Sequence, residues 1–303
     1  MLNALKKKQV SEQAQRISRV KHDRKHILSK KSGFYLQEAY RALRTNVNFA
    51  LADVEGSKIV MVTSALQSEG KSLTTLNMAI ALGQMDQKVL LIDCDLRRPR
   101  MGRLLNLNAP SGLSNVLMNF SLLDEAIVSS EEHGIDLILA GDIPPNPAEL
   151  LSSNRMQKLL KRMRENYDYI ILDSPPVDLV VDAVALSSQC DGVLFVVRAG
   201  QSERGAVIHG MDQLQYAGAN VLGFVFNGVT SETTAGYGKY RFRKYARNGR
   251  YSKYSRYGYG YGYGGGYAYG GYGYGYGGGY AYRSNPNDVP PQQEQPNTPE
   301  KQV

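Results

Sequence analysis

The stretch that decides the fold is Ile59-Val-Met-Val-Thr-Ser64, followed by Ala65-Leu-Gln-Ser-Glu-Gly70-Lys71-Ser72. A short apolar, β-branched run leads into a polar loop, and the helical pattern Leu73 to Met85 comes next. A Gly-Lys-Ser sequence between a strand and a helix is typical of a phosphate-binding loop, or P-loop. The first glycine of the usual Gly-x-x-x-x-Gly-Lys-Ser/Thr pattern is Ala65 here, so the prediction depends on the Gly-Lys-Ser end and its context.

The residue types of this loop suit a nucleotide. Backbone N–H groups and the helix N-terminus can surround phosphate oxygens, Lys71 can neutralise the β- and γ-phosphates, and the Ser72 hydroxyl can ligate Mg²⁺. We therefore predict ATP and Mg²⁺ as cofactors. The predicted nucleotide-binding residues are Gln67, Ser68, Glu69, Gly70, Lys71, Ser72, Leu73 and Asn227. Two interpretations of Asn227 stay open, contact with the adenine edge or a turn before Gly228.

Six apolar runs rich in Val, Ile and Leu alternate with helix-period segments. The runs span residues 58–64, 88–93, 135–140, 169–173, 192–198 and 221–227. Most of them lack polar alternation, which is typical of strands that helices cover on both faces. The pattern predicts an α/β fold with a doubly wound, mostly parallel sheet of the P-loop NTPase type.

Acidic residues end two of these runs. Asp93 and Asp95 follow the second predicted strand, and Asp173 ends the fourth. The carboxyl ends of parallel strands meet at one ligand crevice, so these side chains should face the P-loop. Carboxylates placed side by side repel one another unless a divalent cation is present, so the three acids favour Mg²⁺ at this edge of the sheet. A helix N-cap is the alternative for any one of these acids.

Charge and composition divide the chain into three parts. Residues 1–31 carry ten Lys/Arg against two acids, and residues 236–303 carry ten against three. We expect a basic arm over residues 1–33, a P-loop domain over 34–235, and a low-complexity tail over 236–303. Basic ends favour an anionic surface as partner, although solvated charge on the ends of the chain is the alternative.

The tail is dominated by tyrosine and glycine. Sixteen of the 21 tyrosines lie beyond Gly236, largely in Tyr-Gly dipeptides, and a Pro/Gln/Asn-rich stretch follows from Asn285. Glycine carries a high backbone entropy cost and aliphatic partners are scarce, so we expect no packed core there. The two cysteines, Cys94 and Cys190, suggest neither a disulfide framework nor a zinc site, and no apolar run approaches the ~18 residues that a membrane span needs.

In these motifs the sequence resembles the bacterial tyrosine kinases of capsule and exopolysaccharide assembly. The matching elements are the P-loop variant Ser64 to Ser72, the Asp-x-Asp-x-Arg motif Asp93 to Arg97, and Asp173-Ser-Pro175. A Glu-x-x-Arg-x-x-Arg element is present as Glu38-Ala-Tyr-Arg41-Ala-Leu-Arg44, and a C-terminal tyrosine cluster completes the set. Gln67-Ser68 departs from the Pro-Gly that the family usually carries.

The resemblance implies an ATP-dependent protein-tyrosine kinase that autophosphorylates its tail and regulates polysaccharide synthesis and export. It implies catalytic roles for Lys71, Asp93, Asp95 and Asp173, with Asp93 as the candidate acceptor of the tyrosine proton. Arg97, or alternatively Arg98, would stabilise charge on the γ-phosphate. The resemblance also implies that Asp95 and Asp173, together with Ser72, hold Mg²⁺ directly or through water. Glu38, Arg41 and Arg44 would mediate assembly of a homo-oligomeric ring. The expected phosphoacceptors are Tyr257, Tyr259, Tyr261, Tyr263, Tyr267, Tyr269, Tyr272, Tyr274, Tyr276, Tyr280 and Tyr282.

The same resemblance implies a transmembrane polysaccharide co-polymerase as activator. We expect a cytoplasmic protein at the inner face of the cell membrane, protein substrates modified on tyrosine, and no nucleic-acid partner.

Two other functions fit parts of the sequence. A septum-positioning or plasmid-partition ATPase shares the fold, but its signature lysine near the start of the loop is replaced by Leu66. A nucleotide-regulated interaction protein could instead use the Tyr/Gly-rich tail for aromatic and cation-π contacts.

Overall fold

The computed structural model describes residues 20–229, which form a single seven-stranded sheet in the order β3-β4-β2-β5-β1-β6-β7. The strands are β1 (Lys58–Ser64), β2 (Val89–Asp93), β3 (Ile127–Ser130), β4 (Ile135–Ile138), β5 (Tyr169–Asp173), β6 (Gly192–Arg198) and β7 (Val221–Asn227). All neighbouring strands are parallel except β3 and β4. The predictions for residues 1–19 and for the tyrosine-rich tail lie outside the described residues.

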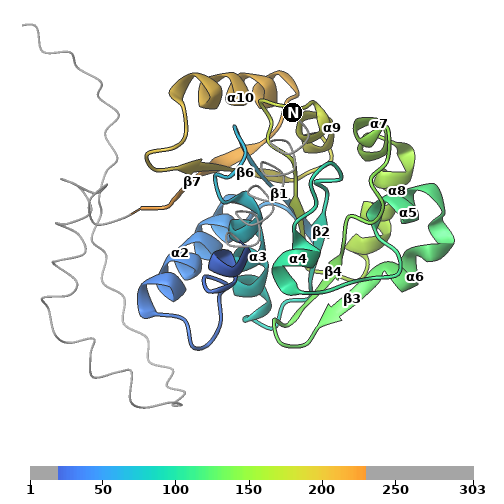
Figure 1. Ribbon diagram of the computed structural model, residues 1–303, viewed down its shortest axis with the longest axis horizontal. Helices are drawn as coiled ribbons and strands as arrows, with labels where there is room; N and C mark the ends of the chain where they lie inside the picture. The colour runs from blue at the N-terminus through green and yellow to red at the C-terminus, as the bar shows by residue number, and fades with distance from the viewer. Residues whose placement is uncertain (1–19, 230–303) are drawn as a thin grey trace, which may run out of the picture. The chain divides into compact units, whose positions relative to one another are not determined.

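Helices cover both faces of the sheet (Figure 1). One layer contains α2 (Phe34–Ala50), α3 (Lys71–Gly83) and α4 (Met101–Leu105). The other contains α5 (Leu113–Met118), the 3₁₀ turn η1 (Phe120–Leu122), α6 (Leu123–Ala126), α7 (Pro147–Leu151), α8 (Asn154–Arg164), α9 (Asp182–Ser187) and α10 (Arg204–Tyr216). The predicted doubly wound α/β fold is confirmed.

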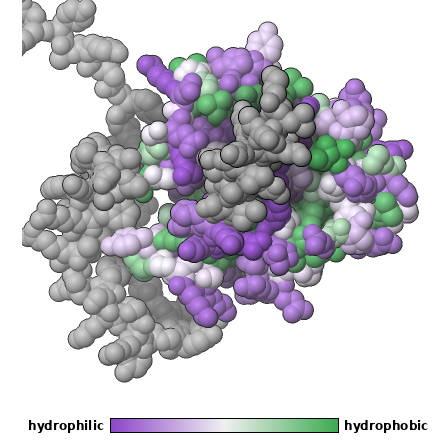
Figure 2. All heavy atoms as spheres, viewed as in Figure 1, coloured by the Kyte–Doolittle hydropathy of each residue, from purple (hydrophilic) through white to green (hydrophobic). Residues whose placement is uncertain are grey.

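The core consists of two clusters, one on each face of the sheet. In β1, Ile59 and Met61 pack into one cluster, while Val60 and Val62 pack into the other. Both faces of this strand are therefore buried, which explains why its sequence is apolar without alternation. Each fully buried aliphatic side chain contributes about 1.5–3 kcal/mol. The surface in Figure 2 is mostly hydrophilic, with hydrophobic residues scattered between.

The segment before α2 packs against the P-loop domain. Leu28 is buried in the same cluster as α3, and Asn77 of that helix accepts a hydrogen bond from the Leu28 N–H (2.8 Å) and donates one to the His26 carbonyl (2.9 Å). Arg24 donates to the Leu104 carbonyl at the end of α4 (3.1 Å). Packed structure in the described chain thus begins before the predicted boundary at residue 33.

Strand order brings the acidic strand ends together. β5 lies between β1 and β2, and Asp173 is in register with Asp93 on one side and with Val62 on the other. The loop after β1 leads directly into α3, so the P-loop and both acidic strand ends meet at the carboxyl edge of the sheet. Within residues 20–229, no helix combines the length and the apolar character needed to cross a bilayer.

Candidate active site

The P-loop has the backbone conformation of an anion cradle. Ser68 and Gly70 both adopt left-handed conformations, with φ of 67° and 92°. Such conformations turn successive N–H groups toward one concavity, at the N-terminus of α3. A Cβ on Gly70 would lie 1.9 Å from the Asn227 side-chain nitrogen, so only glycine fits here.

Side chains at the ends of β6 and β7 hold this loop in place by hydrogen bonds to its backbone carbonyls. Asn227 donates from its amide to the Glu69 carbonyl (2.9 Å), and Arg198 donates to the Ser68 carbonyl (3.4 Å). The Glu69 carboxylate accepts from the Leu66 N–H (2.7 Å) and from the Ser202 hydroxyl. Asn227 therefore supports the loop, and its Oδ1 also accepts from the Gly228 N–H. The turn before Gly228 stays a prediction. Contact with adenine stays a prediction.

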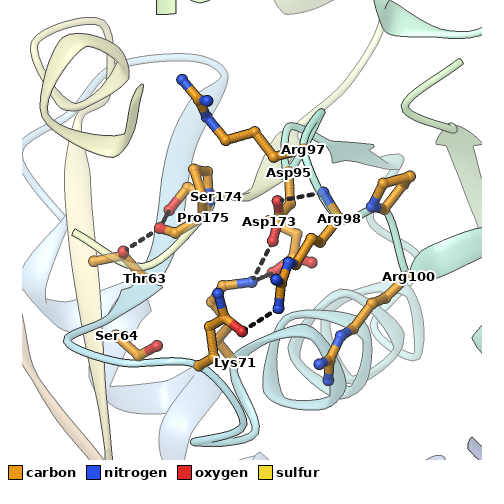
Figure 3. A network of polar contacts seen from close by, with 12 residues as sticks. Thr63, Ser64, Lys71, Asp95, Arg97, Arg98, Arg100, Asp173, Ser174 and Pro175 are labelled. Carbon is orange, nitrogen blue, oxygen red and sulfur yellow. Dashed lines mark hydrogen bonds and ion pairs between the residues drawn. The ribbon is translucent and has the colours of Figure 1, made fainter. Parts of the chain in front are cut away.

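Lys71 is the charged centre of the site (Figure 3). Its buried ammonium lies 3.1 Å from Asp95 Oδ2 and 3.9 Å from Asp173 Oδ1. Burial opposes the charged form, but Asp173, Asp95 and Asp93 outweigh it and raise the pKa of Lys71. Burial raises the pKa of Asp173, against the opposing effects of Lys71 and of hydrogen bonds from Ser72 and Thr75. The site thus concentrates negative charge that a cation must balance.

The donor set fits a hydrated magnesium ion. Asp173 is fully buried, and its Oδ2 has no hydrogen-bond partner within residues 20–229. Ser72 is also buried at this point, at the start of α3. No group of three or more His, Cys, Asp and Glu side chains arranged to hold a metal occurs in the described part of the chain. Mg²⁺ commonly uses one or two carboxylates together with phosphates and water, and Asp95 and Asp173, which meet at Lys71, are two such carboxylates.

Asp93 holds the loop that follows β2. Its Oδ1 accepts from the Asp95 N–H (3.2 Å), and its Oδ2 accepts from the N–H groups of Arg100 and Met101 (3.1 Å each), where α4 begins. Burial, with a further contribution from Asp173, raises its pKa to about 7. The cap-like role considered as the alternative for an acid is therefore present in Asp93, and its role as proton acceptor stays a prediction.

The two neighbouring arginines of this loop point in different directions (Figure 3). Arg97, the predicted catalytic arginine, binds both carboxylate oxygens of Asp182 (2.7 and 3.0 Å) and points away from Lys71. Arg98 instead donates to the Gln67 side chain of the P-loop, while its own N–H bonds to Asp95 (3.0 Å). Of the two, Arg98 is the arginine in contact with the nucleotide loop.

The predicted oligomerisation residues lie on α2. Glu38 and Arg41 form an ion pair at the surface, whereas Arg44 donates to the Ala81 carbonyl near the end of α3 (2.6 Å). Arg44 thereby links α2 to the P-loop helix inside one subunit. Glu38 and Arg41 leave much of their side chains accessible, and contact with another subunit stays a prediction for all three.

Comparison with known proteins places this geometry in a family. A family model described as an AAA domain matches residues 57–217. The tyrosine-protein kinase YwqD of Bacillus subtilis is 39% identical over 203 residues, which cover 67% of this chain and 85% of YwqD. The chain belongs to the bacterial tyrosine kinase family.

Solved structures agree with this assignment. The kinase domain of the Escherichia coli tyrosine kinase Etk superimposes with a TM-score of 0.61 at 38% identity, over 64% of this bacterial tyrosine kinase and 76% of that chain. The septum site-determining protein MinD of Pyrococcus horikoshii has a TM-score of 0.50 at 23% identity, over 58% and 72% of the two chains, and shows the shared fold alone. At the position of the septum-type lysine, Leu66 packs against the core.

Several contacts of the site were not predicted from the sequence. Arg198 and Ser202 brace the P-loop, Thr75 donates to Asp173 (3.2 Å), and Asp182 holds Arg97. Thr75 carried a usable signal, because it lies one helical turn after Lys71 on the face that the strand ends approach. The others are single polar residues distant in sequence, and no local pattern marks them.

Proposed function

We propose that this chain is a Mg-ATP-dependent protein-tyrosine kinase that phosphorylates its own C-terminal tyrosine cluster and regulates capsular or exopolysaccharide synthesis and export. The observation that carries the proposal is the convergence of Lys71, Asp95 and Asp173 on an anion-cradling loop. Family membership supplies the acceptor chemistry, since relatives such as YwqD and Etk are named tyrosine kinases.

Each residue of the site has a defined part in the proposal. Residues 67–73 would surround the phosphates. The Lys71 ammonium would leave Asp95 and Asp173 and neutralise the charge of the transferred phosphoryl group. Ser72, Asp95 and Asp173 would hold Mg²⁺, which supplies Lewis-acid stabilisation of the phosphates when bound. Asp93 is the proposed acceptor of the tyrosine proton, and Arg98 can lie over the phosphates from its position beside Gln67.

The acceptors belong to the same polypeptide. The tyrosine-rich segment follows β7, whose last residue, Asn227, contacts the P-loop itself. A tethered acceptor is present at a high effective concentration. Each phosphotyrosine adds about −1.5 to −2 charges, so a few modifications would reverse the positive charge of the tail.

Phosphosite mapping tests the activity. Incubation of the full chain with Mg-ATP, in the presence of a membrane activator, should place phosphate on tyrosines between Tyr257 and Tyr282. Lys71→Ala should reduce labelling by roughly 100-fold or more, because the lysine stabilises transferred phosphoryl charge. Lys88→Ala, at an exposed lysine that directly precedes β2, is the matched control and should label normally.

The outcomes separate the candidate functions. ADP release without phosphotyrosine would reject the kinase and leave a P-loop ATPase. Nucleotide binding with neither ADP release nor phosphotyrosine would favour a nucleotide-regulated interaction protein. Because Lys71→Ala leaves buried carboxylates without their cation, Ser72→Ala serves as a second, smaller change that should also weaken labelling.

Assembly and location complete the proposal. Glu38, Arg41 and Arg44 would contact a neighbouring subunit in a ring, and a transmembrane polysaccharide co-polymerase would bring the kinase to the inner face of the cell membrane. Unmodified tails would enter neighbouring active sites, and phosphorylation would dissolve the ring by charge repulsion. Sedimentation of phosphorylated and unphosphorylated protein should then give different assembly sizes, and Arg41→Ala should remove the larger one.

A further inference from the structure

Strand β7 forms an open edge of the sheet. Within residues 20–229 it pairs only with β6, and it ends the strand order opposite β3 (Figure 1). Its sequence, Val-Leu-Gly-Phe-Val-Phe-Asn, contains neither a charge nor a proline. Natural edge strands are usually protected by such residues, so an apolar edge of seven residues favours a binding partner.

Two exposed aromatic rings lie on one face of this strand. Phe224 and Phe226 are 57% and 59% exposed. The Phe224 ring lies 5.6 Å from Phe195, and Phe226 is in register with Val197. Leu222 and Val225 pack into the opposite cluster, and a register irregularity in the ladder accompanies Gly223, which has φ of 151°. The two rings therefore extend the α10 face of the sheet beyond its last strand.

The backbone of the same two residues faces the open edge. The Asn227 carbonyl accepts from the Ala199 N–H next to β6 (2.9 Å). Backbone groups of successive residues in a strand point to opposite edges, so those of Phe226 and Phe224 point outward. An added strand would find hydrogen-bonding groups and aromatic rings at the same two residues.

The sequence of this chain contains a segment with matching periodicity. Residues 257–263 read Tyr-Gly-Tyr-Gly-Tyr-Gly-Tyr, and a shorter run of the same kind spans 272–276. In an extended strand, side chains alternate between faces, so every tyrosine lies on one face and every glycine on the other. Aromatic rings on neighbouring strands interact favourably. The glycines would lie on the opposite face of the sheet, the face of Leu222, Val225 and α2, and they have no side chain that would have to fit there.

We propose that the open edge of β7 binds the Tyr-Gly repeat of this chain as an added strand, with its tyrosines on the Phe224/Phe226 face. Between Gly228 and Arg256 the chain is long enough for either strand direction, since a parallel crossover needs about a dozen residues. Docking itself requires no phosphoryl transfer. One consequence rests on the proposed function. Phosphorylation of a tyrosine in the repeat would place a dianion against these rings and would release the strand.

Hydrogen exchange of the full-length protein tests the proposal. The protein is treated with a tyrosine phosphatase and kept free of nucleotide, so the result does not depend on kinase activity. Amides of residues 257–263 or 272–276, and of Phe224 and Phe226, should exchange about tenfold more slowly than freely exchanging amides. The double variant Phe224→Thr, Phe226→Thr replaces the rings by β-branched residues that also favour strands, and it should abolish the protection in the repeat. Tyr216→Thr, at a 97% exposed tyrosine of α10, is the control and should retain it.

A second variant leaves the folded domain untouched. The substitutions Gly258→Tyr, Tyr259→Gly, Gly262→Tyr, Tyr263→Gly, Gly273→Tyr and Tyr274→Gly preserve composition and charge but remove the alternation in both runs. Protection should then be lost at the repeat and at Phe224 and Phe226. Absence of protection in the unaltered chain would overturn the proposal, as would protection of the repeat that survives either variant. Concentration-dependent protection of β7 that survives the rearranged tail would assign the edge to a second copy of β7 instead, and would equally overturn it.

Discussion

Arg97 and Asp182 form a bidentate ion pair that joins the loop after β2 to the start of α9, 85 residues further along the chain. Asp182 is fully buried, while the Arg97 side chain is 43% exposed. Removing the arginine would leave a buried carboxylate without a partner, which is costlier than losing a surface ion pair. We therefore assign Arg97 a structural contact, and the variants below separate it from Arg98.

Arg97→Gln should lower the free energy of unfolding by about 1–3 kcal/mol, measured by urea denaturation. Arg98→Gln is the matched control and should cost less than about 0.5 kcal/mol, because it loses only a surface hydrogen bond. Equal stability losses in the two variants would contradict the distinction. In the Asp182→Asn background, the effect of Arg97→Gln should shrink.

Gly70→Ala should weaken nucleotide binding at least tenfold, because a Cβ would collide with the Asn227 amide and φ is 92°. Binding of a fluorescent ATP analogue measures the change. Gly56→Ala is a matched control, since Gly56 also has positive φ (69°) but nothing within 4 Å of an added Cβ. It should cost only the backbone strain, about 1 kcal/mol of stability, and leave binding intact. Adding Asn227→Ala to Gly70→Ala should restore part of the affinity; no recovery would place the defect elsewhere.

Asp93 should make stability depend on pH in the nucleotide-free, metal-free protein. Its pKa is about 7 in the folded state, against 3.8 ordinarily, so the folded state binds the extra proton between these values. This group therefore contributes stability that is complete below about pH 4 and is lost as pH rises through about 7. Denaturation curves from pH 5 to 8 should show the decline.

The variant Asp93→Asn isolates that contribution. A neutral amide cannot ionise, so the stability difference between the unaltered protein and Asp93→Asn should shift in favour of the variant as pH rises. A difference that is constant from pH 5 to 8 would count against a raised pKa at this position.

Asn77→Ala should loosen the segment before α2. It removes both hydrogen bonds to the backbone of His26 and Leu28, and the expected loss is about 1–3 kcal/mol of unfolding free energy. Trypsin should also cleave faster at Lys25 under native conditions. Asn220→Ala, which loses one exposed hydrogen bond to the Asp191 carbonyl, is the control and should leave cleavage unchanged.

The central sheet could be predicted because its signal is local. All six predicted runs are strands, and the runs at 58–64, 169–173, 192–198 and 221–227 have the observed boundaries. The additional strand β3 was not predicted, because its four residues, Ile-Val-Ser-Ser, carry too short a pattern. Its antiparallel pairing with β4 depends on a tight return through Gly134, which only the folded chain shows.

The meeting of Lys71 with the acidic strand ends could also be predicted. The carboxyl ends of parallel strands lie at one edge of the sheet, and the Gly-Lys-Ser loop identifies the strand next to which they meet. The contacts of Arg97 could not. The sequence Arg97-Arg98 offers two equivalent cations, and the choice depends on Asp182, whose proximity is a property of the tertiary fold. The same limit applies to Arg198, which reaches the P-loop from the end of β6.

The amide of Asn227 joins the root of the tail to the carbonyl of Glu69 by one hydrogen bond. A displacement of Gly228 would consequently reach the P-loop through this hydrogen bond, as well as β6 through the bond between the Asn227 carbonyl and the Ala199 N–H. The strand that leads into the tyrosine-rich part of the sequence is thereby coupled to the loop that we propose binds the nucleotide.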